Sequence, residues 1–257
     1  MDSETGRELY SYSSAGYAVA FSPNSRVILT NMLRASIERN DFGASCAILL
    51  DAATGRAIGT IGYGPLNVGA RAYADLQISR FLGDTAAAGR HEAVLQFIVA
   101  RGYATRSEIE AFYRNGIRGL VSEVVDEEFR GVTVPAQTAA YVKESVTNFL
   151  LTPNQANFNV LRSINNIFND NIGRNLPYIQ STYDFSLRNI AAYESNDMPQ
   201  AAEAARSSAR TSQNILNERR RQLRAPNDAP IDWDGFASRY LRILNGLNTD
   251  LARRVTQ

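Results

Sequence analysis

The chain has 257 residues, of which 44% are hydrophobic and 21% are charged, values typical of a folded globular protein. Its 27 basic and 26 acidic side chains nearly cancel, which argues against a dedicated nucleic-acid-binding protein, since such proteins are usually strongly basic. One cysteine and one histidine exclude a disulfide framework within the chain, a cysteine-only zinc site and a multi-histidine metal site. We therefore expect no metal and no cofactor.

The N-terminal residues 1–21 are predicted to form an extended, flexible arm. Tyr10, Tyr12 and Tyr17 stand there among Ser and Gly without a helical period. A helix is predicted next, over 22–43, because its Ser-Pro start supplies a favoured N-cap and a proline at the first helical position. No apolar run approaches the length of a membrane span and no signal peptide is visible, so no membrane association is expected.

Residues 45–63 are predicted to form a β-hairpin, the one convincing β element of the chain. Two short apolar segments flank a turn-forming stretch that ends at Gly55. The glycines at 59, 62, 64 and 69 are interpreted as the exit loop of this hairpin. A phosphate-binding loop is the alternative, but no Gly-Lys-Ser/Thr follows and Pro65 removes one backbone donor.

From residue 71 onward the pattern is helical almost throughout. Ser107 and Glu110 have the spacing of a capping box, and Asp232 is a good N-cap for the last helix. The fold class is therefore mainly α, with a helical body over 22–224 that contains the hairpin, and a linker and C-terminal helix over 225–257. Apolar spacings of three and four predict helices over about 71–82, 85–101, 107–124, 135–150, 152–168, 178–193, 199–223 and 232–255.

No arrangement of residues points to catalysis. His91 has no second histidine four residues on and no nucleophile with a recognisable local motif. Cys46 begins an apolar segment and is interpreted as a small buried hydrophobe. Asp126, Glu127 and Glu128 are adjacent in sequence and are interpreted as a solvated helix end, because glycosidase carboxylates lie across a cleft from each other. We therefore predict no catalytic residues and no enzyme activity.

Two groups of residues are predicted to contact partners. The first is the set of tyrosines in the arm. The second is a basic segment near the end of a helix, made of Arg219, Arg220, Arg221 and Arg224. Arginine is enriched in protein–protein interfaces, and a contact with nucleic acid is the alternative, although no aromatic stacking platform is interleaved with these arginines.

Several helical segments resemble the helical minor capsid protein that lies beneath the vertices of adenoviruses. These segments are residues 22–29, 93–98, 107–110, 141–146 and 175–179. The resemblance implies a cement protein on the inner face of a capsid, one that ties the penton to surrounding hexons. The present chain is much shorter and its hairpin has no clear counterpart, so the resemblance supports the class, a helical structural protein of a viral particle, more than the family.

We therefore expect a structural interaction protein, a minor capsid or cement protein of a virion assembled in the host nucleus or cytoplasm. Its partners would be other capsid or scaffold proteins, or a second copy. One alternative is a cellular, cytoplasmic helical adaptor or scaffold. The other is an enzyme that uses Asp, Glu, Arg and Tyr at the 59–69 loop, which requires a pocket with Arg56, Tyr63 and Arg71 beside a carboxylate of perturbed pKa.

Overall fold

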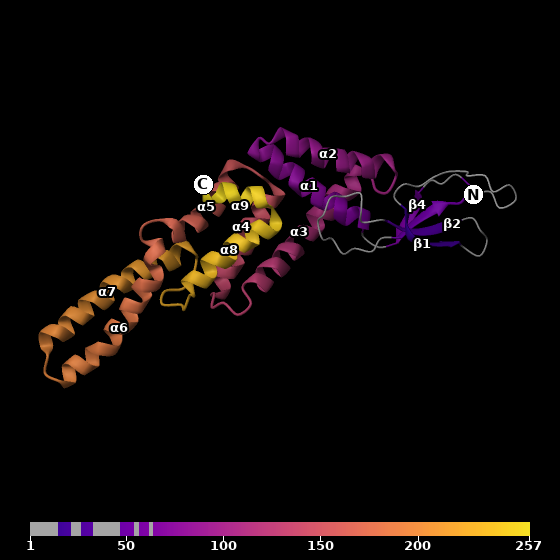
Figure 1. Ribbon diagram of the computed structural model, residues 1–257. Coiled ribbons are helices and arrows are strands. Elements are labelled where there is room, and N and C mark those ends of the chain that lie inside the picture. The colour runs from indigo at the N-terminus through magenta and orange to yellow at the C-terminus, as the bar shows by residue number, and fades with distance from the viewer. Residues whose placement is uncertain (1–14, 22–26, 33–46, 54–56, 62–63) are drawn as a thin grey trace. The chain divides into compact units, whose positions relative to one another are not determined.

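A computed structural model describes residues 15–21, 27–32, 47–53, 57–61 and 64–257 of the chain, which is mainly α-helical (Figure 1). The chain divides into two compact units, Met1–Gly116 and Ile117–Gln257, and the boundary falls within one helix. The predicted boundaries before residue 22 and before residue 225 rested on composition. Packing instead groups 225–257 with the helices that precede it.

The first unit contains an antiparallel sheet in which strands consecutive in sequence are neighbours in space. The predicted hairpin corresponds to the last two strands, which pair with a register irregularity between Leu49 and Leu50. The strands are β1 (Ala15–Phe21), β2 (Val27–Met32), β3 (Ala47–Asp51) and β4 (Ala57–Ile61).

The sheet corrects two expectations for the N-terminal region. Strand β2 lies where a helix was predicted over 22–43, and strand β1 occupies the end of the predicted arm, so the β structure is more than one hairpin. The segment 27–30 is a continuous apolar and β-branched run. Such a run satisfies helical spacings and strand pairing equally, and its β-branched side chains suit a pleated sheet better. Pairing of Val27 with Asp51 and of Asn31 with Ala47 places it beside β3.

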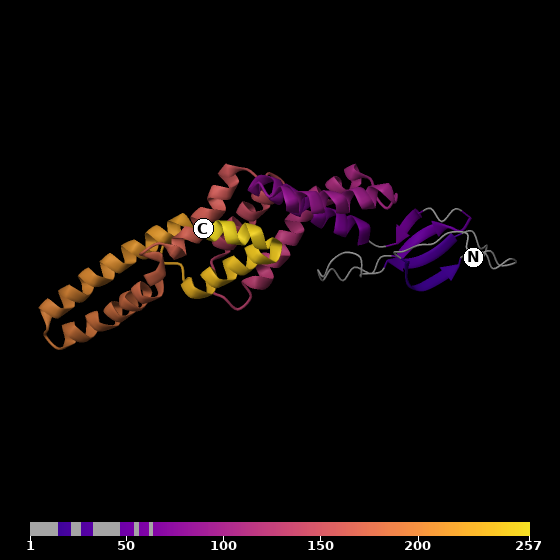
Figure 2. The same cartoon turned by 45° about the horizontal axis from the view of Figure 1, so that its top comes forward.

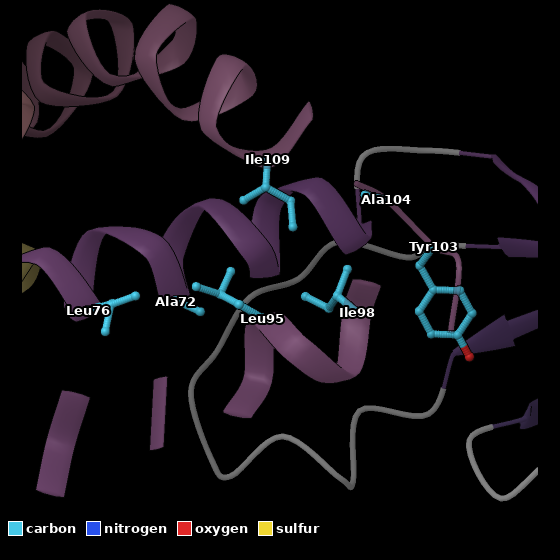
Figure 3. Close-up of a cluster of buried hydrophobic side chains, with 7 residues drawn as sticks. All are labelled: Ala72, Leu76, Leu95, Ile98, Tyr103, Ala104 and Ile109. Carbon is cyan, nitrogen blue, oxygen red and sulfur yellow. The ribbon is translucent and has the colours of Figure 1, made fainter. Parts of the chain in front are cut away.

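Three helices complete the first unit: α1 (Gly64–Leu82), α2 (Thr85–Ala100) and the beginning of α3 (Arg106–Glu128). Gly83 and Gly102 follow α1 and α2 with φ of 74° and 70°, a conformation that glycine adopts without steric cost. Buried side chains from all three helices and from the α2–α3 connection meet in one cluster, shown in Figure 3. Its members are Ala72, Leu76, Leu95, Ile98, Tyr103, Ala104 and Ile109.

The predicted exit loop over 59–69 is wrong in its second half, because α1 already begins at Gly64. Gly69 is a buried helical residue rather than a loop residue. A Cβ atom at this position would lie 2.9 Å from the Cδ1 and Cγ1 atoms of Ile109 on α3. Glycine therefore permits the close approach of α1 and α3, a packing role that a sequence pattern of glycines does not distinguish from a loop.

The capping box of α3 lies two residues earlier than predicted. The Thr105 N–H and hydroxyl donate to the Glu108 carboxylate at 2.7 and 2.8 Å, and the Glu108 N–H donates to the Thr105 hydroxyl oxygen at 3.2 Å. Thr105 and Glu108 thus form the reciprocal pair that was expected of Ser107 and Glu110. Both pairs have the same three-residue spacing, so the spacing alone left the register open.

The second unit is helical. The elements after α3 are α4 (Ala136–Leu151), α5 (Gln155–Asn169), the short 3₁₀ helix η2 (Gly173–Asn175), α6 (Leu176–Ser195), α7 (Pro199–Gln222), α8 (Trp233–Leu247) and α9 (Thr249–Thr256). Side-chain caps begin α5, α8 and α9, whereas α4, α6 and α7 begin without one. Asn154 accepts from the Asn157 N–H at 2.9 Å, and Asp232 accepts from the Gly235 N–H at 2.9 Å. Asn248 ends one helix and caps the next, so the predicted last helix is in fact two.

Stacked aromatic rings form the centre of the second unit. Phe236 on α8 is fully buried and stacks on Phe129 and Phe168, with ring centroids 5.1 and 5.0 Å apart. The hydroxyl of the buried Tyr240 donates to the Leu161 carbonyl on α5 at 2.9 Å. The segment 225–257 therefore contributes to the core of this unit rather than forming an appended helix.

Helices α6 and α7 form an antiparallel hairpin. They lie side by side in Figures 1 and 2, and the turn that joins them lies beyond the other helices of this unit. Their facing positions repeat in heptads, as in a coiled coil. On α6 they are Leu176, Ile179, Tyr183, Ser186, Ile190 and Tyr193, and on α7 they are Ala202, Ala205, Ala209, Ser212, Leu216 and Arg219.

Among the helices that the structure describes, none combines the length and the apolar character that a membrane span requires.

Candidate functional site

The predicted basic segment lies at the C-terminal end of α7, and its four arginines have different surroundings. Arg219 and Arg220 are buried, with 9% and 3% of their surface exposed, whereas Arg221 and Arg224 lie at the surface. Their helix ends in a Schellman motif. The Ala225 N–H donates to the Arg220 carbonyl at 2.8 Å and the Arg224 N–H to the Arg221 carbonyl at 3.0 Å. Arg224 therefore occupies the left-handed position, with φ of 55°.

Arg219 holds a carboxylate at the start of the connection between α5 and η2. Its guanidinium donates to Asp170 at 2.7 Å, and the backbone N–H groups of Ile172 and Gly173 donate to the same carboxylate at 3.0 and 2.6 Å. Burial alone would raise the pKa of Asp170, but these hydrogen bonds and the charge of Arg219 outweigh it and hold the pKa below its usual value. This loop requires Gly173, because a Cβ there would overlap the backbone of Ile167 and Phe168.

Arg220 is a buried cation held by neutral acceptors. It donates to the Ala229 carbonyl at 2.7 Å, to Asn217 Oδ1 at 3.0 Å and to Gln180 Oε1 on α6 at 3.2 Å. Its guanidinium carbon lies 5.8 Å from the centre of the Trp233 ring. Burial lowers the pKa of Arg220, an effect that the charge of Asp228 partly offsets. Arg220 therefore joins α6, α7 and the connection to α8.

The two surface arginines are also paired within the chain. Arg221 lies 2.8 Å from Glu218. Arg224 lies 3.0 Å from Glu144, and its guanidinium carbon is 4.2 Å from the centre of the Tyr141 ring, within the range of a cation–π contact. Only these two of the four predicted contact arginines are accessible to a partner.

A depression of about 390 Å³ lies beside Arg219. Its size is within the range of small-ligand pockets. Its charged groups are already engaged, because Asp170 and Arg219 pair with each other. The lining contains neither His nor Cys, so the depression suits a polar side chain of a partner better than acid–base or nucleophilic chemistry. It is lined by Tyr141, Ser163, Ile164, Asn166, Ile167, Asp170, Arg219 and Gln222.

The other predicted contact residues and the residues of the enzyme alternative fall partly outside the described residues. Tyr10, Tyr12, Arg56 and Tyr63 are outside the described residues, as is Cys46.

Tyr17 lies within β1. Arg71, the described member of the enzyme alternative, donates to Asp75 one turn further along α1 at 2.9 Å. His91 is a residue of α2.

The acidic cluster at the end of α3 is engaged in ion pairs rather than gathered at one point. Asp126 lies 2.7 Å from Lys143, Glu127 lies 2.5 Å from Arg130, and Glu128 lies 3.3 Å from Arg239. Each carboxylate has a different cation, as expected for adjacent residues that point in different directions. Among the described residues, no group of three or more His, Cys, Asp and Glu side chains is placed to hold a metal ion.

Two exposed aromatic side chains on the α6–α7 hairpin were not predicted from the sequence. Tyr178 and Phe185 on α6 are 73% and 57% exposed. They are seven residues apart and therefore lie on the same side of the helix. Leu187 is 46% exposed. A heptad reading that placed Leu176, Ile179, Tyr183 and Ser186 at the facing positions would have found this face from the sequence.

No protein-family model, curated protein or solved structure matches this chain.

Proposed function

We propose that this chain is a structural protein that joins protein subunits and has no catalytic role of its own. The observation that carries the proposal is the pair of exposed aromatic rings, Tyr178 and Phe185, on one side of the projecting α6–α7 hairpin. Large apolar side chains on the surface, particularly tyrosine and other aromatic residues, are enriched where proteins bind one another.

The use of charge in the second unit supports this proposal. Arg219 and Arg220 are buried in contacts that hold the helices together, and the surface cations Arg221 and Arg224 are each paired with a glutamate. Such pairing leaves little unbalanced positive charge at this end of α7 for a phosphate backbone. A partner protein is therefore favoured over nucleic acid.

The proposal that this structural protein belongs to a viral particle rests on the resemblance to the vertex cement protein of adenoviruses. In this particle setting, the chain is a minor capsid component of the virion and its partners are other capsid proteins. The alternative is a cellular adaptor or scaffold, which would use the same hairpin face. The identity of the partner therefore distinguishes a capsid protein from a cellular adaptor.

The test is site-specific photo-crosslinking of the full chain in the cells that produce it. A photoreactive phenylalanine analogue replaces Phe185, and the same analogue at Leu187 is the matched control. Both residues are exposed on α6, but they are two positions apart and face different sides of the helix. We expect a discrete adduct of higher mass at Phe185 and none at Leu187.

Mass spectrometry of the adduct then identifies the partner. A capsid protein supports the particle setting, and a cellular protein outside any particle replaces that setting by the adaptor. An equal pattern at both positions, or no adduct at either, contradicts the interaction role of this face.

A further inference from the structure

The two flanks of the α6–α7 hairpin carry different chemistry. On one flank, Arg206 of α7 is paired with Glu194 of α6 across the hairpin and with Glu203 one turn away at 3.2 Å. The other charged residues of this flank are Asp184 and Arg210. In an antiparallel pair of helices, the residues that flank the facing positions on one side of the first helix lie next to the residues that flank them on the same side of the hairpin in the second helix. The Arg206–Glu194 pair therefore identifies the flank to which these charged residues belong, and we call it the charged flank.

On the opposite flank, between Tyr178 and Ala192 of α6 and between Ala201 and Ile215 of α7, the residues beside the other helix are uncharged, and the exposed Arg188 lies at the outer edge. We call this flank the aromatic face. The hydrogen bond between the hydroxyls of Ser186 and Ser208, at 3.2 Å, crosses the hairpin on this side. The aromatic face comprises Tyr178, Thr182, Phe185, Asn189 and Ala192 of α6 with Ala201, Ala204, Ser208, Thr211 and Ile215 of α7.

From this distribution we infer that the aromatic face binds the same face of a second copy of this chain, related by a two-fold axis. The inference rests on the proposed function, because it names the partner of the hairpin. Large side chains, Tyr178 and Phe185, lie on α6, and the α7 part is made largely of small residues such as Ala204. A two-fold axis that runs parallel to the helices places α6 of one copy over α7 of the other, so that protruding rings meet a surface with room for them.

The size of the face fits a weak dimer. Residues 178–192 of α6 form about 22 Å of helix, and a helix is about 10 Å wide. Two helices side by side therefore offer about 450 Å² per copy, or about 900 Å² in a pair, which is in the range of weak, transient interfaces. We therefore expect a reversible dimer rather than an obligate one.

The charge distribution favours a second copy over a charged partner. The residues of the aromatic face are uncharged, so their own burial carries no desolvation penalty of the kind that unpaired ions impose, and Arg188 lies at the edge of the face. A strongly acidic or basic partner would find no opposite charge on this face. The charged flank, with Arg206 and Glu194, stays outside such an interface and in contact with solvent.

The test is the mass of the purified full chain in solution, measured by sedimentation and light scattering over concentrations up to about 100 μM. The substitution Phe185→Arg places a charge in the aromatic face, and Leu187→Arg places the same charge on the other side of α6. A second pair repeats the comparison on α7, with Ala204→Arg in the face and Glu203→Arg on the charged flank. All four positions are exposed, and far-UV circular dichroism checks that the helices are retained.

We expect the unmodified chain to approach twice its mass of 28.3 kDa at high concentration. Phe185→Arg should raise the dimer dissociation constant by at least about 30-fold, as for loss of a central aromatic contact, and Ala204→Arg should act similarly. Leu187→Arg and Glu203→Arg should leave the constant within about threefold of the original.

A chain that stays monomeric at all concentrations overturns the inference, and so does a dimer that all four substitutions weaken equally or leave intact. A monomer whose Phe185 position still crosslinks to another protein overturns the second copy as partner but leaves the proposed function standing. A monomer without any crosslink contradicts both.

Discussion

Replacement of Arg220 by alanine tests whether the basic segment serves the fold or a partner. The side chain is 3% exposed and donates to the Ala229 carbonyl, to Asn217 and to Gln180. Alanine removes three hydrogen bonds and the contact of the guanidinium with Trp233. The adjacent Arg221 is exposed and makes a local ion pair, so Arg221→Ala is the matched control.

The magnitude follows from these contacts. A hydrogen bond from a charged donor contributes about 1.5 kcal/mol, so three contribute about 4.5 kcal/mol. The cost of removing the guanidinium from water in the folded protein offsets part of this sum. We expect Arg220→Ala to lower the free energy of unfolding of the second unit by about 3 kcal/mol. Arg221→Ala should change it by less than about 0.5 kcal/mol, as for other exposed ion pairs.

Urea denaturation followed by tryptophan fluorescence measures this difference. Trp233 is the only tryptophan and lies in the second unit beside Arg220, so the signal reports this unit. With a urea dependence of about 2 kcal/mol per molar, the midpoint for Arg220→Ala should fall by about 1.5 M. Equal midpoints for the two variants would refute a structural role. If Arg220→Ala lost partner binding but kept its stability, Arg220 would instead have a role in binding a partner.

Three further predictions concern packing and pH. Gly69→Val should lower the stability of the first unit by about 2 kcal/mol, because the added side chain overlaps Ile109. Adding Ile109→Ala to this variant should restore part of the lost stability. Hydrogen exchange in α1 measures the stability of both variants. Phe236→Ala should cost about 4 kcal/mol and Phe236→Leu less than half of that, whereas equal costs would exclude ring stacking as the cause. The pKa of Asp170 is held low, so its stabilising effect is present above the unfolded pKa and is lost as pH falls through the folded pKa. Asp170→Asn should therefore flatten the acid side of the stability profile, whereas a profile as steep as before would contradict the contribution of the Arg219 pair.

The positions of most helices follow from local chemistry that is visible in the sequence. Pro199 begins α7 and Asp232 caps α8, as their residue types predict, because a helix start depends on a few neighbouring backbone groups. Small residues recur at the facing positions of the first half of α7, where Ala202 and Ala209 are buried against α6. These features need only contacts that are short in sequence or a spacing along one helix.

Other features depend on residues distant in sequence. The segment 27–32 is a strand that pairs with β3, although its apolar spacing also fits a helix.

The basic segment shows most clearly the difference between what the local sequence indicates and what tertiary contacts decide. In the sequence, Arg219, Arg220, Arg221 and Arg224 are one run of like charges. The tertiary structure buries the first two, because Asp170 and the Ala229 carbonyl reach them from other segments, and leaves the last two at the surface. Sequence determines where a helix runs and which residue types it carries. Only packing decides which side of it meets water, because burial depends on what the rest of the chain places there.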